Sequence, residues 1–163
     1  MKLSEREKWM KKALKEAEKA FAEGEVPIGA IVVCDGKIVG RGHNKRTRLQ
    51  LATAHAEIEA IEKACKKQGS WRIPECELYV TLEPCPMCMG AALNARISKV
   101  YFGAFEQKGR SLTKELASAN LLNHTLPVEG GVLETECREI LTRFFSEMRE
   151  RTKKETKMGA SND

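Results

Sequence analysis

The chain has 163 residues, 42% of them apolar, and 28 basic against 23 acidic residues give a net charge of +5. This length fits a single domain with a substantial core, and the basic balance suits a nucleic-acid partner. No apolar run approaches the roughly 20 residues that cross a bilayer, and the polar N-terminus is unlike a signal peptide. We therefore expect a cytoplasmic protein without a membrane partner.

The first half of the chain combines helical and strand patterns. Ser4 and Glu7 form a capping-box pattern ahead of a helical repeat, and Gly24 follows that repeat as a stop signal. The dipeptide Asp35-Gly36 between two β-rich runs predicts a tight hairpin. The expected elements are a helix over 4–23, strands over 26–34 and 38–44, a loop over 45–54 and a helix over 54–70.

The second half continues the alternation of strands and helices, which predicts an α/β fold with a sheet covered on both faces. Its last helix is amphipathic and ends in a basic stretch. The expected elements are a strand over 77–82, a helix over 86–96, a strand over 99–105, a loop over 107–124 that holds a short helix, a short strand within 126–133 and a helix over 134–154.

Two of the six cysteines, Cys85 and Cys88, stand three positions apart in "PCPMC". Without a secretion signal the thiols should stay reduced, so the pair suggests metal binding or catalysis. Pro86 suits the first position of a helix, which would place Cys88 one turn on with both sulfurs facing one point. A redox pair is the alternative, but a thioredoxin-like motif would follow the first strand of a βαβ unit, and this pair follows a third strand.

A closed structural zinc site needs four protein ligands, and the chain has no second Cys-x-x-Cys or His pair. The best third ligand is His55, which begins the preceding helix. Two sulfurs and one nitrogen would leave the fourth position to water, as in catalytic zinc sites. Glu57 can face the same point only where a helix begins, and there it could move a proton from water to a leaving group.

The combination of His-x-Glu at 55–57 and Pro-Cys-x-x-Cys at 84–88 is the signature of the zinc-dependent nucleobase deaminases. The stretches "EVPIGAIVV", "TAHAEIEAI", "ELYVTLEPCPMCMGA" and "NHTLPVEGGVLETECREILTRFF" resemble bacterial tRNA adenosine deaminases over almost the whole chain. The resemblance implies a three-layer α/β/α cytidine-deaminase-like sandwich with a mixed five-stranded sheet. It also implies one zinc-dependent deaminase domain over 1–158 and a disordered C-terminal tail over 159–163.

The same resemblance assigns expected roles to side chains. The protein would convert adenosine to inosine at the wobble position of a tRNA anticodon stem-loop, as a homodimer whose subunits both contact the RNA. The implied residues are His55, Cys85 and Cys88 as ligands of one Zn²⁺ per subunit, Glu57 as proton shuttle, Asn44 as a contact of the flipped nucleoside, Val26 and Pro84 as walls of the base pocket, and Arg46 and Lys108 as RNA contacts.

One loop departs from the family pattern. In "FEQKGRSL" at 105–112, Glu106 stands where the family usually has Asp, and a Gly-rich turn is shortened. Because this loop lies by the nucleic-acid groove in the family, a deaminase of a free base or nucleotide, such as cytosine or guanine, is the alternative. A zinc-stabilised RNA-binding subunit without activity is a third, but such partners typically lose the shuttle glutamate, which is present here as Glu57. His43 and His124 are expected to be structural.

Overall fold

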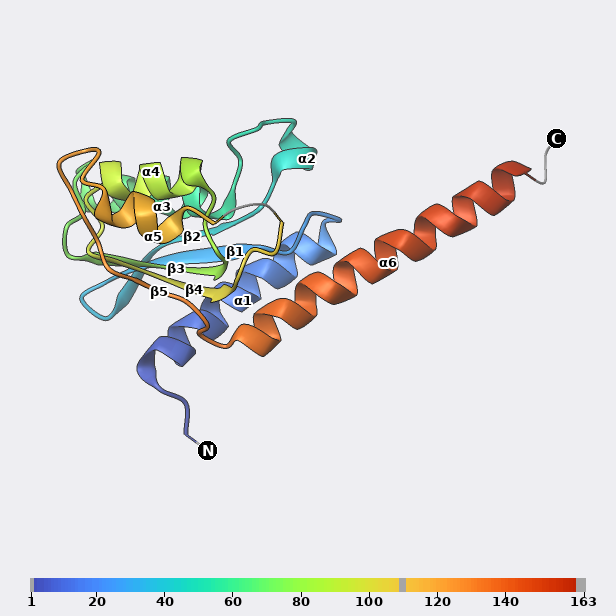
Figure 1. The fold of residues 1–163 in the computed structure, drawn as a ribbon, viewed down its shortest axis with the longest axis horizontal. Coiled ribbons are helices and arrows are strands. Elements are labelled where there is room, and N and C mark those ends of the chain that lie inside the picture. Colours follow the sequence, from blue (N-terminus) through green and yellow to red (C-terminus); the bar gives the residue numbers. More distant parts are fainter. Residues whose placement is uncertain (1, 109–110, 161–163) are drawn as a thin grey trace.

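The computed structural model describes residues 2–108 and 111–160. The predicted elements are present with small shifts of their ends (Figure 1). In chain order they are α1 (Glu5–Ala22), β1 (Gly29–Cys34), β2 (Lys37–His43), α2 (Arg46–Leu49), α3 (Ala56–Gln68), β3 (Cys76–Leu82), α4 (Pro86–Asn94), β4 (Lys99–Ala104), α5 (Thr113–Ser118), β5 (Val128–Glu129) and α6 (Glu134–Ala160).

Two predictions of irregular structure need correction. The short helix α2 lies inside the predicted loop over 45–54, where no apolar repeat announces it. Helix α6 continues to Ala160, two residues into the predicted disordered tail, because the residues before Gly159 are mostly good helix formers. The remaining tail residues, 161–163, lie outside the described part of the chain.

The strands form one mixed five-stranded sheet in the order β2-β1-β3-β4-β5. Strand β1 pairs antiparallel with β2 and with β3, whereas β3–β4 and β4–β5 are parallel pairs. Asp35 and Gly36 join β1 to β2 with φ angles of 50° and 70°, the left-handed backbone that a two-residue hairpin turn requires. The predicted hairpin and mixed sheet are confirmed.

Helices cover both faces of this sheet, which gives the predicted three-layer sandwich (Figure 1). Helices α1 and α6 lie on one face, and α3, α4 and α5 on the other. Successive side chains of β1 point to opposite faces of the sheet and pack in two separate hydrophobic clusters. Ile31 packs in the cluster on the α1/α6 side, and Val32 packs in the cluster on the α3/α4 side. The capping box at α1 is also confirmed, because the Ser4 hydroxyl accepts from the Glu7 N–H and the Glu7 carboxylate from the Ser4 N–H.

The C-terminal half of α6 projects away from the sandwich (Figure 1). Its buried residues, Cys137, Ile140, Leu141 and Phe144, all lie in the first half of the helix. Neither α6 nor any other helix in the described residues combines the length and the apolar run that a bilayer crossing requires. The projecting half therefore presents its polar and charged side chains to the surroundings.

Strand β2 carries a glycine where α3 comes closest to the sheet. A Cβ atom added at Gly40 would lie 2.1 Å from the backbone oxygen of Ala60. The helix backbone would have to move, so we expect Gly40→Ala to lower the free energy of unfolding by about 3 kcal/mol. Urea denaturation would measure the loss, and Gly159→Ala, with nothing within 4 Å of the added carbon, is the matched control. An unfolding midpoint equal to that of the wild type would contradict this close packing.

Candidate active site

The first residues of α3 and α4 meet at one end of the sandwich. His55 is the N-cap of α3 and Cys85 the N-cap of α4, each with extended backbone, and Pro86 is the first residue of α4 as predicted. Because His55 stands outside the helical register, its side chain and that of Glu57 can converge, which two such positions within a helix cannot do. Cys88 follows one turn after Cys85 and is fully buried.

The three predicted ligand side chains point their donor atoms at one another. His55 Nδ1 lies 3.7 Å from Cys85 Sγ and 3.5 Å from Cys88 Sγ. Zinc bonds of about 2.3 Å to sulfur and about 2.0 Å to nitrogen at tetrahedral angles place such donors about 3.6 Å apart. The three donors therefore fit a tetrahedral ion with one further coordination position.

Protonation in this cluster is unequal between the two thiols. The hydrogen bond from the Cys88 thiol, together with His55, lowers the pKa of Cys85 to about 4 against the opposing effect of burial. The same pairing, with burial, raises the pKa of Cys88. The hydrogen bond to Cys85 raises the pKa of His55. Both cysteines bind a metal as thiolates and the histidine binds it as a neutral imidazole, so ligation releases whatever protons these three groups still hold.

Glu57 is 4% exposed and lies against this cluster. Burial raises the pKa of its carboxyl group, while hydrogen bonding to Cys88 and the charge of His55 act in the opposite direction. A carboxyl whose pKa is raised by burial gains and loses a proton more readily near neutral pH than an exposed one. Its surroundings suit a group that moves protons.

A cavity of about 650 Å³ opens beside His55, Glu57 and Cys85. It is lined by the segment before β1, the residues after β2, the start of α3, the end of β3, the loop after β4, and α6. A volume of this size falls within the range of small-molecule and cofactor sites. The metal-ligand cluster and the buried carboxylate thus share an accessible cavity.

Comparison with known proteins places this arrangement in a family. The model of the MafB19-like deaminases matches residues 4–149. The chain belongs to this deaminase family. A tRNA-specific adenosine deaminase of Bacillus subtilis is 48% identical over 153 residues, which are 93% of this chain and 95% of the relative.

Solved structures agree with this assignment. A structure from work on A-to-I editing by tRNA:A34 deaminases is 41% identical, with a TM-score of 0.73 over 82% of this chain and 99% of the other. A guanine deaminase of Bacillus subtilis is 40% identical with a TM-score of 0.59, and the match covers 63% of this chain and 66% of that protein. The structures similar to this chain therefore include one from work on tRNA editing and one named a guanine deaminase.

Within this deaminase fold, two of the three predicted pocket residues line the cavity. Asn44 and Val26 lie on its wall, and they are linked, because Asn44 Nδ2 donates to the Val26 backbone oxygen at 3.3 Å. Asn44 Oδ1 accepts from the Arg46 N–H at 3.2 Å. Pro84 is buried and is not among the lining residues; its backbone oxygen accepts from the Thr113 hydroxyl instead.

Both predicted RNA contacts border the cavity, Arg46 from the start of α2 and Lys108 from the loop after β4. The loop with Lys108 is ordered by carboxylates: Glu83 accepts from the Glu106 N–H at 3.0 Å, and Glu106 accepts from the N–H groups of Gln107 and Lys108. Glu106, which departs from the family pattern, thereby organises its own turn. Residues 109–110 of this loop lie outside the described part of the chain.

Sequence reasoning missed the contribution of α6 to the cavity. This helix supplies lining residues that lie more than 80 positions after His55 in the sequence. These residues carry no motif of their own. The only signal available was that basic and aromatic residues stand close together along the helix. The α6 lining residues are Arg138, Leu141, Thr142, Phe145 and Arg149.

The two other histidines make contacts away from the donor cluster. His43 lies between the carboxylates of Glu16 on α1 and Glu23 at the C-cap of that helix, with Nε2 3.0 Å from Glu23 and Nδ1 3.5 Å from Glu16. His124 Nε2 lies 2.8 Å from the backbone oxygen of Ile97. These contacts join elements of the fold, in agreement with the structural role expected for both.

Glu59, on α3, ties that helix to the end of β2. Its carboxylate accepts from the His43 N–H and pairs with Lys45. Partial burial raises the pKa of Glu59, but the bonds from Lys45 and His43 outweigh it, so that the pKa is lowered overall. A lowered folded-state pKa contributes stability above the unfolded-state pKa, and this stability is lost as pH falls through the folded-state value.

We therefore expect Glu59→Gln to lower Tm modestly at pH 7 and to differ little from wild type at a pH below the folded-state pKa of Glu59. The pair is partly exposed, so solvent screening keeps the effect small. Thermal unfolding across this pH range would measure it, with Glu62→Gln, an exposed residue of the same helix, as the control. A Tm difference between variant and wild type that stays constant with pH would contradict the prediction.

Proposed function

We propose that this protein hydrolyses adenosine to inosine at the wobble position of a tRNA anticodon. The observation that carries the proposal is the donor set of His55, Cys85 and Cys88 with buried Glu57 at its side, beside a cavity. That constellation lies in a chain 48% identical, over nearly its full length, to a protein named for this activity. The structural relative from work on A34 editing supports the same substrate.

The donor set supports zinc as the metal, one ion per chain, held by His55, Cys85 and Cys88. When bound, zinc lowers the pKa of a coordinated water and so supplies hydroxide near neutral pH. Glu57 would accept one proton of the attacking water and deliver it to the ring nitrogen beside C6 of adenine. It would then take the second proton from the hydroxyl formed at C6 and deliver it to the departing amine, which leaves as ammonia. Water and adenosine are consumed, and inosine and ammonia are released.

The rest of the cavity supports a nucleoside presented on an RNA strand. Asn44 and Val26 lie on the wall next to Glu57 and would contact the flipped base and ribose. Three basic residues line the cavity: Arg46 at the start of α2, Lys108 in the loop after β4 and Arg149 on α6. They would pair with phosphates on both sides of the flipped nucleotide. Base flipping suits this arrangement because the reacting atom is inaccessible while the base is stacked.

We also propose that the enzyme works as a homodimer in the cytoplasm, where its tRNA substrate is found. Apolar side chains are exposed on or just after α2 and in the first turn of α4: Leu49 at 47%, Leu51 at 52% and Met87 at 37%. A second copy that covered them would remove this apolar surface from water. Sedimentation velocity tests this directly, since a species of 18.2 kDa would be the monomer.

The test of function is mass spectrometry of nucleosides after incubation of zinc-loaded protein with an anticodon stem-loop that carries adenosine at the wobble position. Inosine is expected in the stem-loop, and a stem-loop with guanosine at that position is the control. A parallel panel of cytosine, guanine and nucleotides, followed by ammonia release, tests the free-base alternative. Ammonia from a free base without inosine in the RNA would overturn the RNA assignment.

A further inference from the structure

The short helix α2 begins without a cap from its own N-cap side chain. Its N-cap residue, Lys45, makes no side-chain cap bond, and four residues are too few to hold a helix by their own hydrogen bonds. The first N–H groups of any helix need acceptors from elsewhere. Something outside α2 must therefore hold this turn in place.

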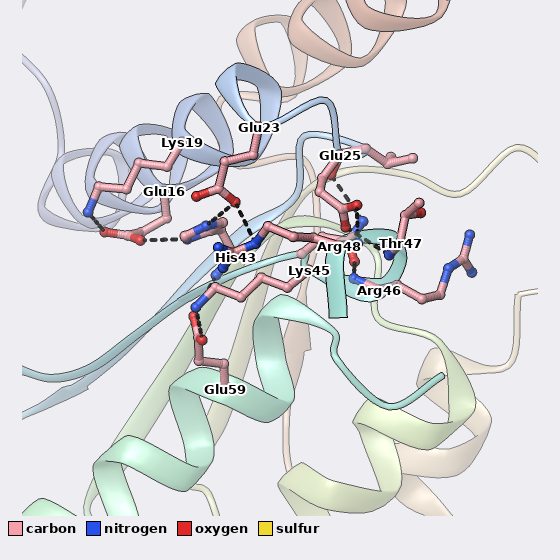
Figure 2. A network of polar contacts seen from close by, with 12 residues as sticks. Glu16, Lys19, Glu23, Glu25, His43, Lys45, Arg46, Thr47, Arg48 and Glu59 are labelled. Carbon is pink, nitrogen blue, oxygen red and sulfur yellow. Dashed lines mark hydrogen bonds and ion pairs between the residues drawn. The ribbon is translucent and has the colours of Figure 1, made fainter. Parts of the chain in front are cut away.

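A buried carboxylate from another part of the chain meets this need. Glu25 is 3% exposed and precedes the cavity residue Val26. Its Oε2 accepts from the Thr47 N–H at 3.1 Å and its Oε1 from the Arg48 N–H at 2.9 Å. Figure 2 shows this carboxylate pointing from the segment between α1 and β1 toward the first turn of α2.

Neighbouring hydrogen bonds link the Glu25–α2 contact to the wall of the cavity. The remaining first-turn donor, the Arg46 N–H, goes to Asn44 Oδ1, and the amide of Asn44 is bonded to the Val26 backbone oxygen. Glu25 and Val26 on one side, and Asn44 with α2 on the other, thus form a closed set of contacts. Three of its members, Val26, Asn44 and Arg46, line the cavity in which the proposed nucleotide would bind.

The other carboxylates near α2, those of Glu23 and Glu59, contact different atoms from those that Glu25 contacts. Glu23 lies 3.0 Å from His43 Nε2 and 3.7 Å from Arg48 Nε, which are side-chain atoms (Figure 2). Glu59 holds the His43 N–H and the Lys45 ammonium (Figure 2). Glu25 differs from both because it binds backbone N–H groups of α2, and backbone contacts fix the path of the chain.

From this geometry we propose that Glu25 is a positioning residue, which fixes α2 and the Asn44–Arg46 wall and thereby sets the affinity of the cavity for its RNA substrate. Glu25 does not touch the reacting atoms. The inference rests on the proposed function for its substrate, but its structural half, the anchoring of α2, is independent of any activity.

The test compares Glu25→Gln with wild type in two measurements. Glutamine keeps one acceptor oxygen and replaces the other with a donor that faces an N–H group. We expect backbone amides in 45–51 to exchange hydrogen about tenfold faster, with exchange in β1 unchanged. With the stem-loop substrate we expect KM to rise about tenfold, while kcat stays within about threefold and metal content is unchanged.

Glu18→Gln, the same change at an exposed position of α1, is the matched control and should alter neither measurement. If Glu25→Gln does not fold, Glu25→Asp repeats the test, since aspartate keeps the charge but falls one methylene short of the two N–H groups. A role limited to stability would reduce the folded fraction, and with it the apparent kcat, without changing KM. That result, or unchanged exchange in 45–51, overturns the proposal.

Failure of the proposed function would give a different result from failure of the positioning role of Glu25. If the wild-type protein does not deaminate the stem-loop, the substrate assignment fails, and hydrogen exchange still reports whether Glu25 anchors α2. KM for the free base that the metabolite panel identifies then replaces KM for RNA. An unchanged KM for that base in Glu25→Gln would overturn the positioning role at this cavity.

Discussion

Glu57→Gln is expected to bind metal as the wild type does and to lose deamination by about 10³-fold or more. Glutamine has nearly the same shape as glutamate, but it can neither accept the proton of water nor deliver one to the departing amine. Glu57 is not part of the donor set of His55, Cys85 and Cys88, so the metal site should remain intact. Single-turnover deamination and metal analysis by mass spectrometry, on the same preparation, measure the two properties separately.

Glu62→Gln is the matched control, since it makes the same chemical change at an exposed position one and a half turns further along α3. It should keep both metal and turnover. If Glu57→Gln retained turnover near the wild-type rate, another group would have to move the proton. If it lost the metal, Glu57 would be needed for the metal site itself. The first outcome would reject the role of Glu57 as proton shuttle. The second would reject the claim that Glu57 moves protons without helping to hold the metal.

Cys88→Ser is expected to remove most of the bound metal and, with it, all measurable turnover. A serine hydroxyl has almost the volume of the thiol but is a poor ligand for zinc, and two donors remain where three are required. Cys88 is fully buried, so no exposed side chain can take its place without rearrangement. The metal content of protein purified in the presence of zinc measures the loss, and a lowered Tm is expected because metal binding stabilises the folded state.

Cys65→Ser controls for the general effect of replacing a thiol. Cys65 is half-buried on α3, and its thiol contacts the backbone oxygen of Trp71, away from the donor set. This variant should keep one metal ion per chain and wild-type turnover. Full metal occupancy in Cys88→Ser would mean that the ion is held by a different set of residues, and the mechanism proposed for Glu57 would lose its basis.

Local patterns were predictable because their geometry depends on neighbours in sequence. The capping box of Ser4 and Glu7, the Asp35-Gly36 turn and the helix start at Pro86 each involve residues within four positions of one another. The convergence of His55 with Glu57 followed in the same way from the start of a helix. Where no local signal existed, prediction failed: α2 has no cap of its own, and its anchor Glu25 lies about 20 positions earlier.

The sequence by itself determined the chemistry, since the ligand types and their spacing at two helix starts specify a three-donor metal site with a carboxyl group beside it. Only the tertiary structure decided the shape of the cavity around that site. It placed Arg138, Phe145 and Arg149 of α6 on the far wall, left Pro84 off the wall, and positioned Asn44 through Glu25 and Val26. The physical reason is range: spacing within one turn fixes which side chains face one point, whereas a cavity wall depends on how distant helices pack across the sheet.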